Sequence, residues 1–252
     1  MKRSLLLFSL ILFAFSFLAV AQTKLRPPVA NKRAAQTPSE NSTRAIVVDE
    51  RLAVLRAEPS LYARPLQRMR RGRLVLISGS RESDGVTFYR VNAPPNNSGW
   101  VQAEALTGKF KNGEDERLAK LVQASEGFEQ IERAMLFLET FPNSALRPPI
   151  LLLLGDLIEE NAAKISQEAA RRLNKREMTA SGAPTHSFYL NYTSLDRFRR
   201  LGINFHFNSS TKMFHYDGAA WKEIVQKFPN SSEAFEAKKR LDSLKEKLEK
   251  KQ

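Results

Sequence analysis

The chain changes its hydrophobic period near residue 110. Between residues 44 and 107, short apolar and β-branched runs alternate with turn sequences, whereas from residue 114 onward apolar positions recur every three or four residues. The first pattern is typical of short strands and the second of amphipathic helices. We therefore predict an all-β region at 44–107 and a mainly α-helical region at 114–250.

Five short strands are predicted in the all-β region. Turn sequences precede three of them: Gly72, then Ser83-Asp84-Gly85, then Pro94-Pro95-Asn96-Asn97. The predicted strands are 45–48, 52–56, 73–77, 86–91 and 99–101. Five short strands joined by such turns are typical of a small barrel.

The helical region contains the sequence Phe-Pro-Asn-Ser twice, at 141–144 and 228–231. Each copy lies between two stretches of helical period, and proline ends one helix and favours the start of the next. The apolar spacing also predicts a break near Ser125-Glu126-Gly127 and a long helix that begins at Pro148-Pro149.

The helical period is interrupted between those two copies. A loop is predicted at 179–184 and a short helix at 195–201. Residues 203–207 then alternate with period two, a turn follows, and residues 213–216 form a second short apolar run. This pattern predicts a β-hairpin near 203–217.

Four segments of the all-β region resemble, in the correct order, the motifs of bacterial SH3 domains. Residues 53–60, AVLRAEPS, are similar to the family's LNVRSGPS stretch, although Val54 replaces the usual Asn and Glu58 the usual Gly. The other segments are Gly72 with the strand after it, residues 84–91 with Phe88 in the usual Trp position, and Gly99-Trp100-Val101 followed by Leu106. The resemblance implies an SH3-like barrel that binds peptides, in several relatives those of the cell wall.

The helix–FPxS–helix unit resembles tetratricopeptide-type repeats, especially the form found in envelope-assembly and cell-division scaffold proteins. Two copies separated by a long gap would form a short, irregular array, and a plain helical bundle is the alternative. The predicted fold is thus multidomain: a small all-β SH3-like barrel, followed by a mainly α-helical tetratricopeptide-like region with an inserted β-hairpin.

The N-terminus has the features of a secretory signal peptide at 1–21. Lys2 and Arg3 precede an apolar run over 5–18, and Ala19-Val20-Ala21 is a small-x-small cleavage site. The apolar run is shorter than the roughly 20 residues that span a bilayer, which disfavours the alternative of an uncleaved anchor. We expect a periplasmic or extracellular protein without a stable transmembrane segment after cleavage, and a flexible linker at 22–43.

Composition removes several classes of chemistry. The 252 residues include no cysteine, which excludes cysteine nucleophiles and thiolate metal sites. The formal charge is +13, and cleavage of the signal peptide with its two cations leaves +11. Such charge suits solvated surfaces or anionic neighbours. Export argues against a genomic partner, so we expect no nucleic acid.

The three histidines, His186, His206 and His215, all lie in the interruption, near Asp217. They are candidates for metal binding or acid–base chemistry, and surface histidines on an amphipathic hairpin are the alternative. If Phe205 faces the core, His206 faces solvent. The candidate hairpin surface is His206, His215, Tyr216 and Asp217. No metalloprotease or serine-hydrolase motif is present, so we expect neither an enzyme nor a cofactor.

The SH3-like region offers aromatic and cationic side chains for a ligand groove. The candidates are Tyr62, Phe88, Tyr89, Trp100, Arg70 and Arg71. Phe88 and Trp100 are equally suited to a barrel core.

The sequence therefore predicts an exported, non-enzymatic binding or scaffold protein of the bacterial cell envelope. Its SH3-like module would recognise a wall or peptide ligand, and its helical module would bind a protein partner. The alternatives are an accessory or targeting subunit of a cell-wall-modifying enzyme, and a charge-driven binder of anionic surfaces.

Overall fold

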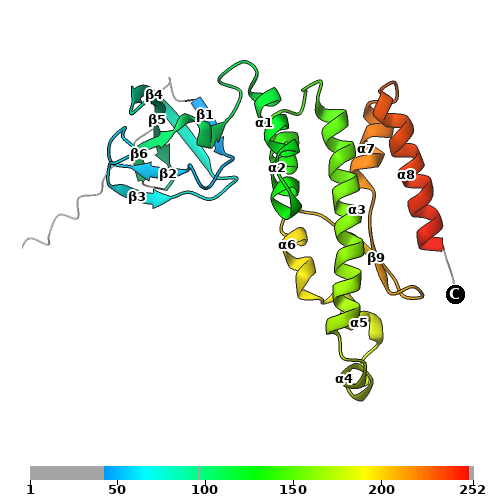
Figure 1. Ribbon diagram of the computed structural model, residues 1–252. Helices are drawn as coiled ribbons and strands as arrows, with labels where there is room; N and C mark the ends of the chain where they lie inside the picture. The colour runs from blue at the N-terminus through cyan, green and yellow to red at the C-terminus, as the bar shows by residue number, and fades with distance from the viewer. Residues whose placement is uncertain (1–42, 96, 250–252) are drawn as a thin grey trace, which may run out of the picture. The chain divides into compact units, whose positions relative to one another are not determined.

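A computed structural model describes residues 43–95 and 97–249. The predicted signal peptide at 1–21, and the linker apart from Thr43, lie outside these residues. The described part is mixed: one region of β-strands is followed by one of helices with a hairpin (Figure 1). Over the described ranges, no helix is long and apolar enough to cross a membrane.

The β region is one antiparallel sheet of seven strands in the order β3-β2-β6-β5-β4-β1-β7. The strands are β1 (Thr43–Val47), β2 (Val54–Arg56), β3 (Pro65–Arg68), β4 (Leu74–Ser83), β5 (Val86–Ala93), β6 (Asn97–Gln102) and β7 (Leu106–Thr107). The outer strands β3 and β7 do not pair with each other in the described part of the chain, so the sheet does not close into a barrel there, although a small barrel was predicted. The mixed, two-region architecture is confirmed.

Two strands escaped the prediction because their sequences lack a strand signal. β3 is Pro-Leu-Gln-Arg, and it forms because β2 provides a partner, with Leu55 opposite Gln67. β7 has two residues and pairs with β1 through Val47 and Leu106. Both depend on a neighbouring strand more than on local propensity.

One face of the sheet buries the β-region core. Ala45 lies opposite Val75, and Ile77 opposite Val91, so these side chains share a face, and all four are buried. Each aliphatic side chain buried in this way contributes roughly 1.5–3 kcal/mol. The alternation that predicted the strands therefore also identified the core face.

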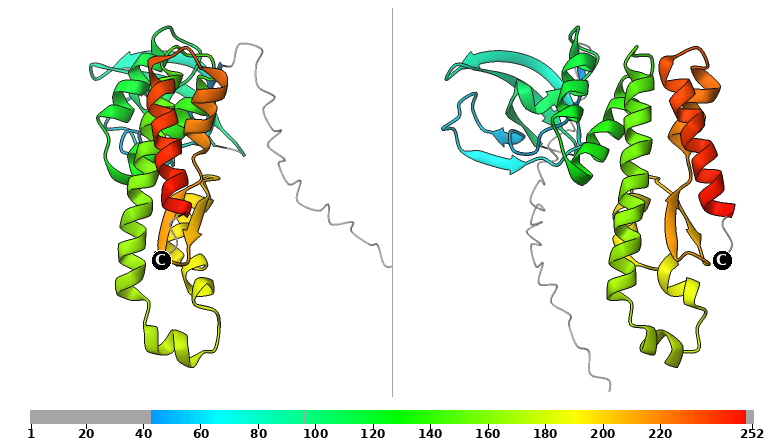
Figure 2. Two further views of the ribbon diagram at one scale, coloured as in Figure 1. Left: turned by 90° about the vertical axis from the view of Figure 1, so that its right-hand side faces the viewer. Right: turned by 45° about the vertical axis from the view of Figure 1, so that its right-hand side comes forward.

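The helical region has eight α-helices in its described part (Figure 2). They are α1 (Glu114–Gln123), α2 (Gly127–Thr140), α3 (Arg147–Arg172), α4 (Lys175–Ala180), α5 (Thr185–Leu190), α6 (Asp196–Arg199), α7 (Ala219–Lys227) and α8 (Ser232–Glu249). Short 3₁₀ turns lie at Ala103–Ala105 and Thr193–Leu195. The predicted break before residue 127 and the proline start of α3 are confirmed.

The two Phe-Pro-Asn-Ser sequences form the same turn. In the first, the Phe141 amide donates to Phe137 and the Ser144 amide donates to Phe141. In the second, Phe228 donates to Ile224, and Ser231 donates to Phe228. Each copy therefore closes one helix, α2 or α7, and leads into the next, as predicted.

The interruption is more helical than predicted. Part of the expected loop at 179–184 is the end of α4, and α5 was not expected. The hairpin is present as β8 (Phe205–Asn208) and β9 (Met213–Tyr216). Its Phe207 ring stacks on Tyr189 of α5 at 4.6 Å between ring centres, so the predicted hairpin packs against the helix that was not predicted.

Candidate binding sites

The structure divides the six residues predicted for a ligand groove. Phe88 is completely buried, so its assignment to an exposed groove is wrong, and it is a core residue. Tyr89 packs against the sheet core and meets Phe110 edge to face at 5.7 Å. Tyr62 is 90% exposed, Arg70 is exposed and Trp100 is half-buried.

Arg71 has a different role from the one predicted. Its guanidinium donates to Glu129 at 2.6 Å, to Glu132, and to the Val48 carbonyl at 3.2 Å. With 11% of its side chain exposed, it is engaged in these contacts and does not belong to an exposed groove on the sheet. A single sequence does not reveal this role because the partners lie about 60 residues further along the chain.

The loop that carries Tyr62 is held by Asp84 at the turn between β4 and β5. The Asp84 carboxylate accepts hydrogen bonds from the Ser60 hydroxyl at 2.7 Å and the Leu61 amide at 2.8 Å. These two donors, the hydroxyl first, lower the pKa of Asp84 below its ordinary value. The loop is therefore fixed at its centre while it exposes the Tyr62 ring.

Trp100 lies in a row with two arginines that the sequence reasoning missed. Trp100 of β6 is opposite Arg56 of β2 on one side and Arg90 of β5 on the other. Directly opposed residues share a face of the sheet. Arg56 also donates to the Ala63 carbonyl at 2.9 Å, which ties the row to the Tyr62 loop. The Tyr62 loop and the row of Arg56, Trp100 and Arg90 together offer two aromatic rings and two cations, which suit carboxylate and apolar groups.

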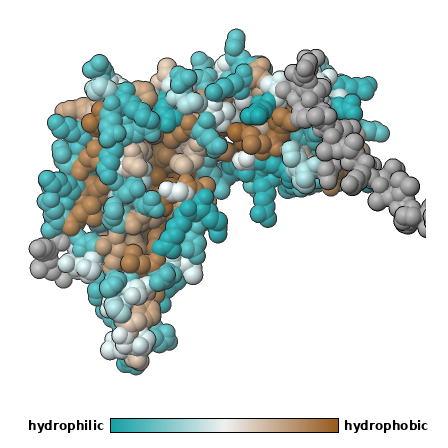
Figure 3. Space-filling model, turned by 180° about the vertical axis from the view of Figure 1, so that it is seen from behind, coloured by the Kyte–Doolittle hydropathy of each residue, from teal (hydrophilic) through white to brown (hydrophobic). Residues whose placement is uncertain are grey.

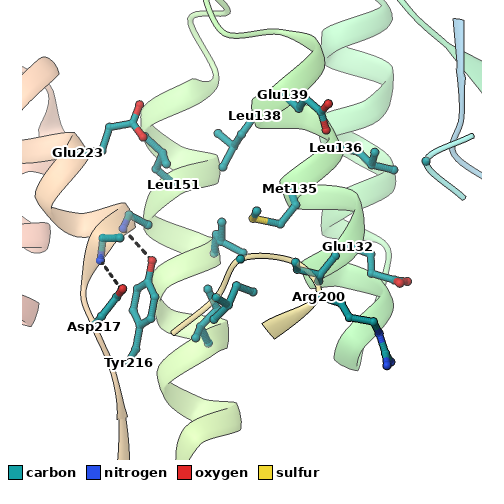
Figure 4. Close-up of a pocket in the computed structure, with 18 of the residues that line it drawn as sticks. Glu132, Met135, Leu136, Leu138, Glu139, Leu151, Arg200, Tyr216, Asp217 and Glu223 are labelled. Carbon is teal, nitrogen blue, oxygen red and sulfur yellow. Dashed lines mark hydrogen bonds between the residues drawn. The ribbon is translucent and has the colours of Figure 1, made fainter. Parts of the chain in front are cut away.

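A cleft of about 640 Å³ lies mainly in the helical region, and Arg71 and Gly72 of the β region also line it. Figure 4 shows Met135 and Leu138 reaching from α2 toward Leu151 of α3, with Tyr216 and Asp217 on the other wall. Seen from behind, apolar surface gathers in bands over the helical region between hydrophilic areas (Figure 3). Half-buried aliphatic side chains with polar groups at the edge are typical of a site that takes an apolar group.

Several charged groups of the cleft are already paired. Arg147 forms an ion pair with Glu223 at 2.7 Å and donates to the Leu138 carbonyl at 2.7 Å. Burial pushes the pKa of Glu223 upward, but the hydrogen bond and charge of Arg147 outweigh burial and leave this pKa below its ordinary value. Glu139 and Arg200 line the cleft without an ion pair to any described residue, and Arg200 points away from its centre (Figure 4).

The hairpin histidines do not form a joint site. His206 and His215 are directly opposite in the register, but His206 is exposed and His215 is buried. The solvent-facing position of His206 is confirmed, whereas a surface position for His215 is wrong. His186 is exposed on α5, and no group of three potential metal ligands occurs among the described residues.

Glu159 of α3 explains why His215 is buried. Its carboxylate accepts hydrogen bonds from the Tyr216 amide at 2.8 Å and from Lys247 at 2.8 Å, and it lies 3.1 Å from Nδ1 of His215. Burial raises the pKa of Glu159, but these partners lower it more strongly, so the carboxylate stays ionised. We define Glu159, His215 and Lys247 as the Glu159 cluster, which fixes β9 and α8 to α3.

The candidate hairpin surface is therefore mostly internal. Tyr216 is 4% exposed, and its hydroxyl accepts a hydrogen bond from the Ala220 amide. Asp217 is half-buried at the cleft and accepts one from the Ala219 amide. Two candidate surfaces are taken forward from the described residues: the Tyr62–Trp100 face of the sheet and the cleft. A comparison of the whole chain with models of protein families, with curated proteins and with solved structures finds no match.

Proposed function

We propose that the protein is an exported, non-enzymatic binding or scaffold protein of the bacterial cell envelope. Its β region, which resembles bacterial SH3 domains, would recognise a wall or peptide ligand through the Tyr62–Trp100 face. Its helical region, which resembles tetratricopeptide repeats, would bind a protein partner in the cleft. Export rests on the signal-peptide pattern of residues 1–21.

The observation that carries this proposal is the cleft itself. Its walls are mainly aliphatic, and its Arg147 and Glu223 neutralise each other. Catalytic sites instead hold ionisable groups poised near the reacting atoms. An aliphatic cleft whose Arg147 and Glu223 are paired with each other supports binding of an apolar side chain over proton transfer.

The Tyr62–Trp100 face supports the part of the proposal that concerns a wall or peptide ligand. Tyr62 projects into solvent from a loop that Asp84 and Arg56 hold in place. Arg56 and Arg90 beside Trp100 suit a ligand that carries carboxylates, as peptides do. Two modest surfaces on one chain would add avidity toward a partner that engages both.

Peptidoglycan sedimentation tests the wall ligand. The mature chain, residues 22–252, is incubated with purified insoluble peptidoglycan at 50 and 500 mM salt, beside Tyr62→Ala and the matched exposed control Leu74→Ala. We expect retention of the mature chain and of Leu74→Ala at both salt concentrations, and at least about tenfold weaker retention of Tyr62→Ala. Retention lost at high salt, or equal for all three, would contradict a specific wall site.

Selection from a random peptide library displayed on phage tests the cleft. Selected peptides are then synthesised and titrated against the mature chain, Met135→Lys and the exposed control Lys238→Ala. We expect apolar peptides whose affinity falls at least about tenfold with Met135→Lys and is unchanged with Lys238→Ala. Peptides whose affinity is the same for Met135→Lys and for the unsubstituted chain would show that the cleft is not the binding site.

The alternatives predict different results. An accessory subunit of a wall-modifying enzyme would raise that enzyme's activity on peptidoglycan, and Met135→Lys would abolish this effect. A charge-driven binder would lose retention at high salt, whatever the state of Tyr62 or Met135.

A further inference from the structure

One end of the helical region is strongly basic. Between residues 170 and 200 the chain has seven Lys or Arg and two Asp or Glu. The cations come from the end of α3, from α4 and from α6. Both ribbon views place α4 and α5 at the far end of α3 (Figures 1 and 2). We call Arg171, Lys175 and Arg176, together with the partly exposed Leu190, the basic end.

Two of the seven cations form ion pairs with described residues, and Arg197 lies over the rings of Phe128 and Phe198. Arg172 pairs with Glu168 at 3.0 Å, and Arg199 pairs with Asp196 at 3.1 Å. Arg171, Lys175 and Arg176 are exposed and have no ion pair to any residue in the described ranges. The last turn of α3 also has the negative end of the helix dipole, which accounts for one or two cations there. Lys175 and Arg176 lie outside α3 and exceed that need.

Apolar side chains accompany these cations. Leu190 at the end of α5 is 41% exposed, and Phe188 of the same helix is half-buried. Arg199 donates to the Leu190 carbonyl, which places the α6 cations beside α5. Cations on helices next to a partly exposed apolar group are typical of a membrane interface, where long basic side chains reach the headgroups and apolar groups enter the boundary below them.

We propose that the basic end docks on the anionic headgroups of a phospholipid bilayer as a peripheral contact. A soluble polyanion would use the cations alone, whereas a bilayer also uses Leu190. This inference goes beyond the proposed function, because neither the sheet face nor the cleft includes these residues.

Vesicle co-sedimentation of the mature chain tests the contact. Vesicles of phosphatidylcholine alone are compared with vesicles that contain about one third phosphatidylglycerol, at 150 mM salt. The variant Arg171→Glu/Lys175→Glu/Arg176→Glu is compared with Lys109→Glu/Lys111→Glu/Lys238→Glu, which changes net charge equally at exposed, unpaired positions. Circular dichroism and thermal melting check that both variants fold.

We expect binding to the anionic vesicles alone. The partition coefficient of the basic-end variant should be at least about 100-fold lower, because each of the three replaced cations contributes several-fold to binding at an anionic surface. The control variant should lose much less. Leu190→Ser should weaken vesicle binding several-fold and leave binding to heparin, a soluble polyanion, unchanged.

Three results would overturn the proposal. The first is absence of binding to anionic vesicles. The second is an equal loss for the two triple variants, which would mean that net charge alone drives adhesion. The third is Leu190→Ser binding to both vesicles and heparin as the mature chain does, which would identify the basic end as a site for polyanions in general.

Discussion

Gly155 lies on α3 where the indole of Trp221 comes closest to that helix. A Cβ atom at this position would meet the Nε1 of Trp221 and would lie 2.7 Å from Cε2 and 2.8 Å from Cδ1. Trp221 is 2% exposed and belongs to the helical core, so its ring has no free direction in which to move. Glycine is therefore required at this position because it lets Trp221 pack closely against α3. Its backbone flexibility is not needed inside a helix.

Gly155→Ala should destabilise the protein despite the higher helix propensity of alanine. The clash costs more than the roughly 1 kcal/mol that alanine contributes in a helix, so we expect a net loss of about 1–2 kcal/mol. Urea unfolding of the mature chain measures it. Gly79→Ala is the control, because nothing lies within 4 Å of its Cβ. An equal effect of the two substitutions would refute the packing role.

Glu159 is a second single residue on which the stability of the fold depends. Its pKa is lower in the folded protein than in the unfolded chain. Its contribution to stability is therefore fully present well above the ordinary value of 4.5, and is lost as pH falls through the folded pKa.

Glu159→Gln should lose about 1–3 kcal/mol of stability at pH 7, since Lys247 then has no negatively charged acceptor. As pH falls below 4.5 the difference from the unsubstituted chain should shrink, because the carboxyl group of the unfolded chain then takes up a proton and the charge of Glu159 contributes less to stability. Unfolding free energies at pH 7 and pH 3.5 measure both. A difference independent of pH would show that the charge of Glu159 is unimportant.

The β8–β9 hairpin shows at the scale of elements how a short segment joins others. One face carries Phe207 and Phe214, which contact Tyr189 of α5. The other carries His215, which reaches Glu159 of α3. The hairpin thus fills the space between helices, and its histidine is part of a structural contact.

The Tyr62 loop depends on a single turn residue. Asp84 has φ of 54°, a conformation in which Asn and Asp are tolerated best. Asp84→Ala should remove both hydrogen bonds and the backbone preference, and should speed hydrogen exchange of residues 57–64 several-fold. Asp84→Asn, which retains the backbone preference, should have a smaller effect. Unchanged exchange in Asp84→Ala would mean that the loop is held by other contacts.

At the scale of the whole described chain, the sheet and the helices share contacts. Val48, which follows β1, is completely buried in the helical core cluster. Its carbonyl accepts hydrogen bonds from Arg71 and from Arg133 of α2. Arg133, 4% exposed, also pairs with Glu129 at 2.7 Å. These shared groups favour unfolding of the two regions in one transition.

Arg71→Gln should lower the stability of the mature chain by about 1–3 kcal/mol, because it leaves Glu129 and Glu132 without this partner. The neighbouring Arg70→Gln, at an exposed position without an ion pair to any described residue, should change it by less than about 0.5 kcal/mol. Thermal unfolding compares the two. If both changes are small, the ion pairs of Arg71 do not stabilise the contact between sheet and helices.

The sequence by itself determined the local elements. The change of period near residue 110, the two Phe-Pro-Asn-Ser turns and the hairpin follow from rules that act over a few residues, and the structure places them as predicted. The weak strand β3 and the short helices α4 and α5 were missed, because they depend on neighbours distant in the chain.

Only the tertiary structure decided which side chains remain available. Phe88, Arg71 and His215 all carry groups suited to a binding site, yet each is occupied by partners that the fold brings close. Tyr62 and Trp100 retain exposed area, and Arg56 and Arg90 join Trp100 through strand pairing. Periodicity reports which face of an element is apolar, whereas burial and pairing depend on what packs against that face, and this is a property of the whole fold.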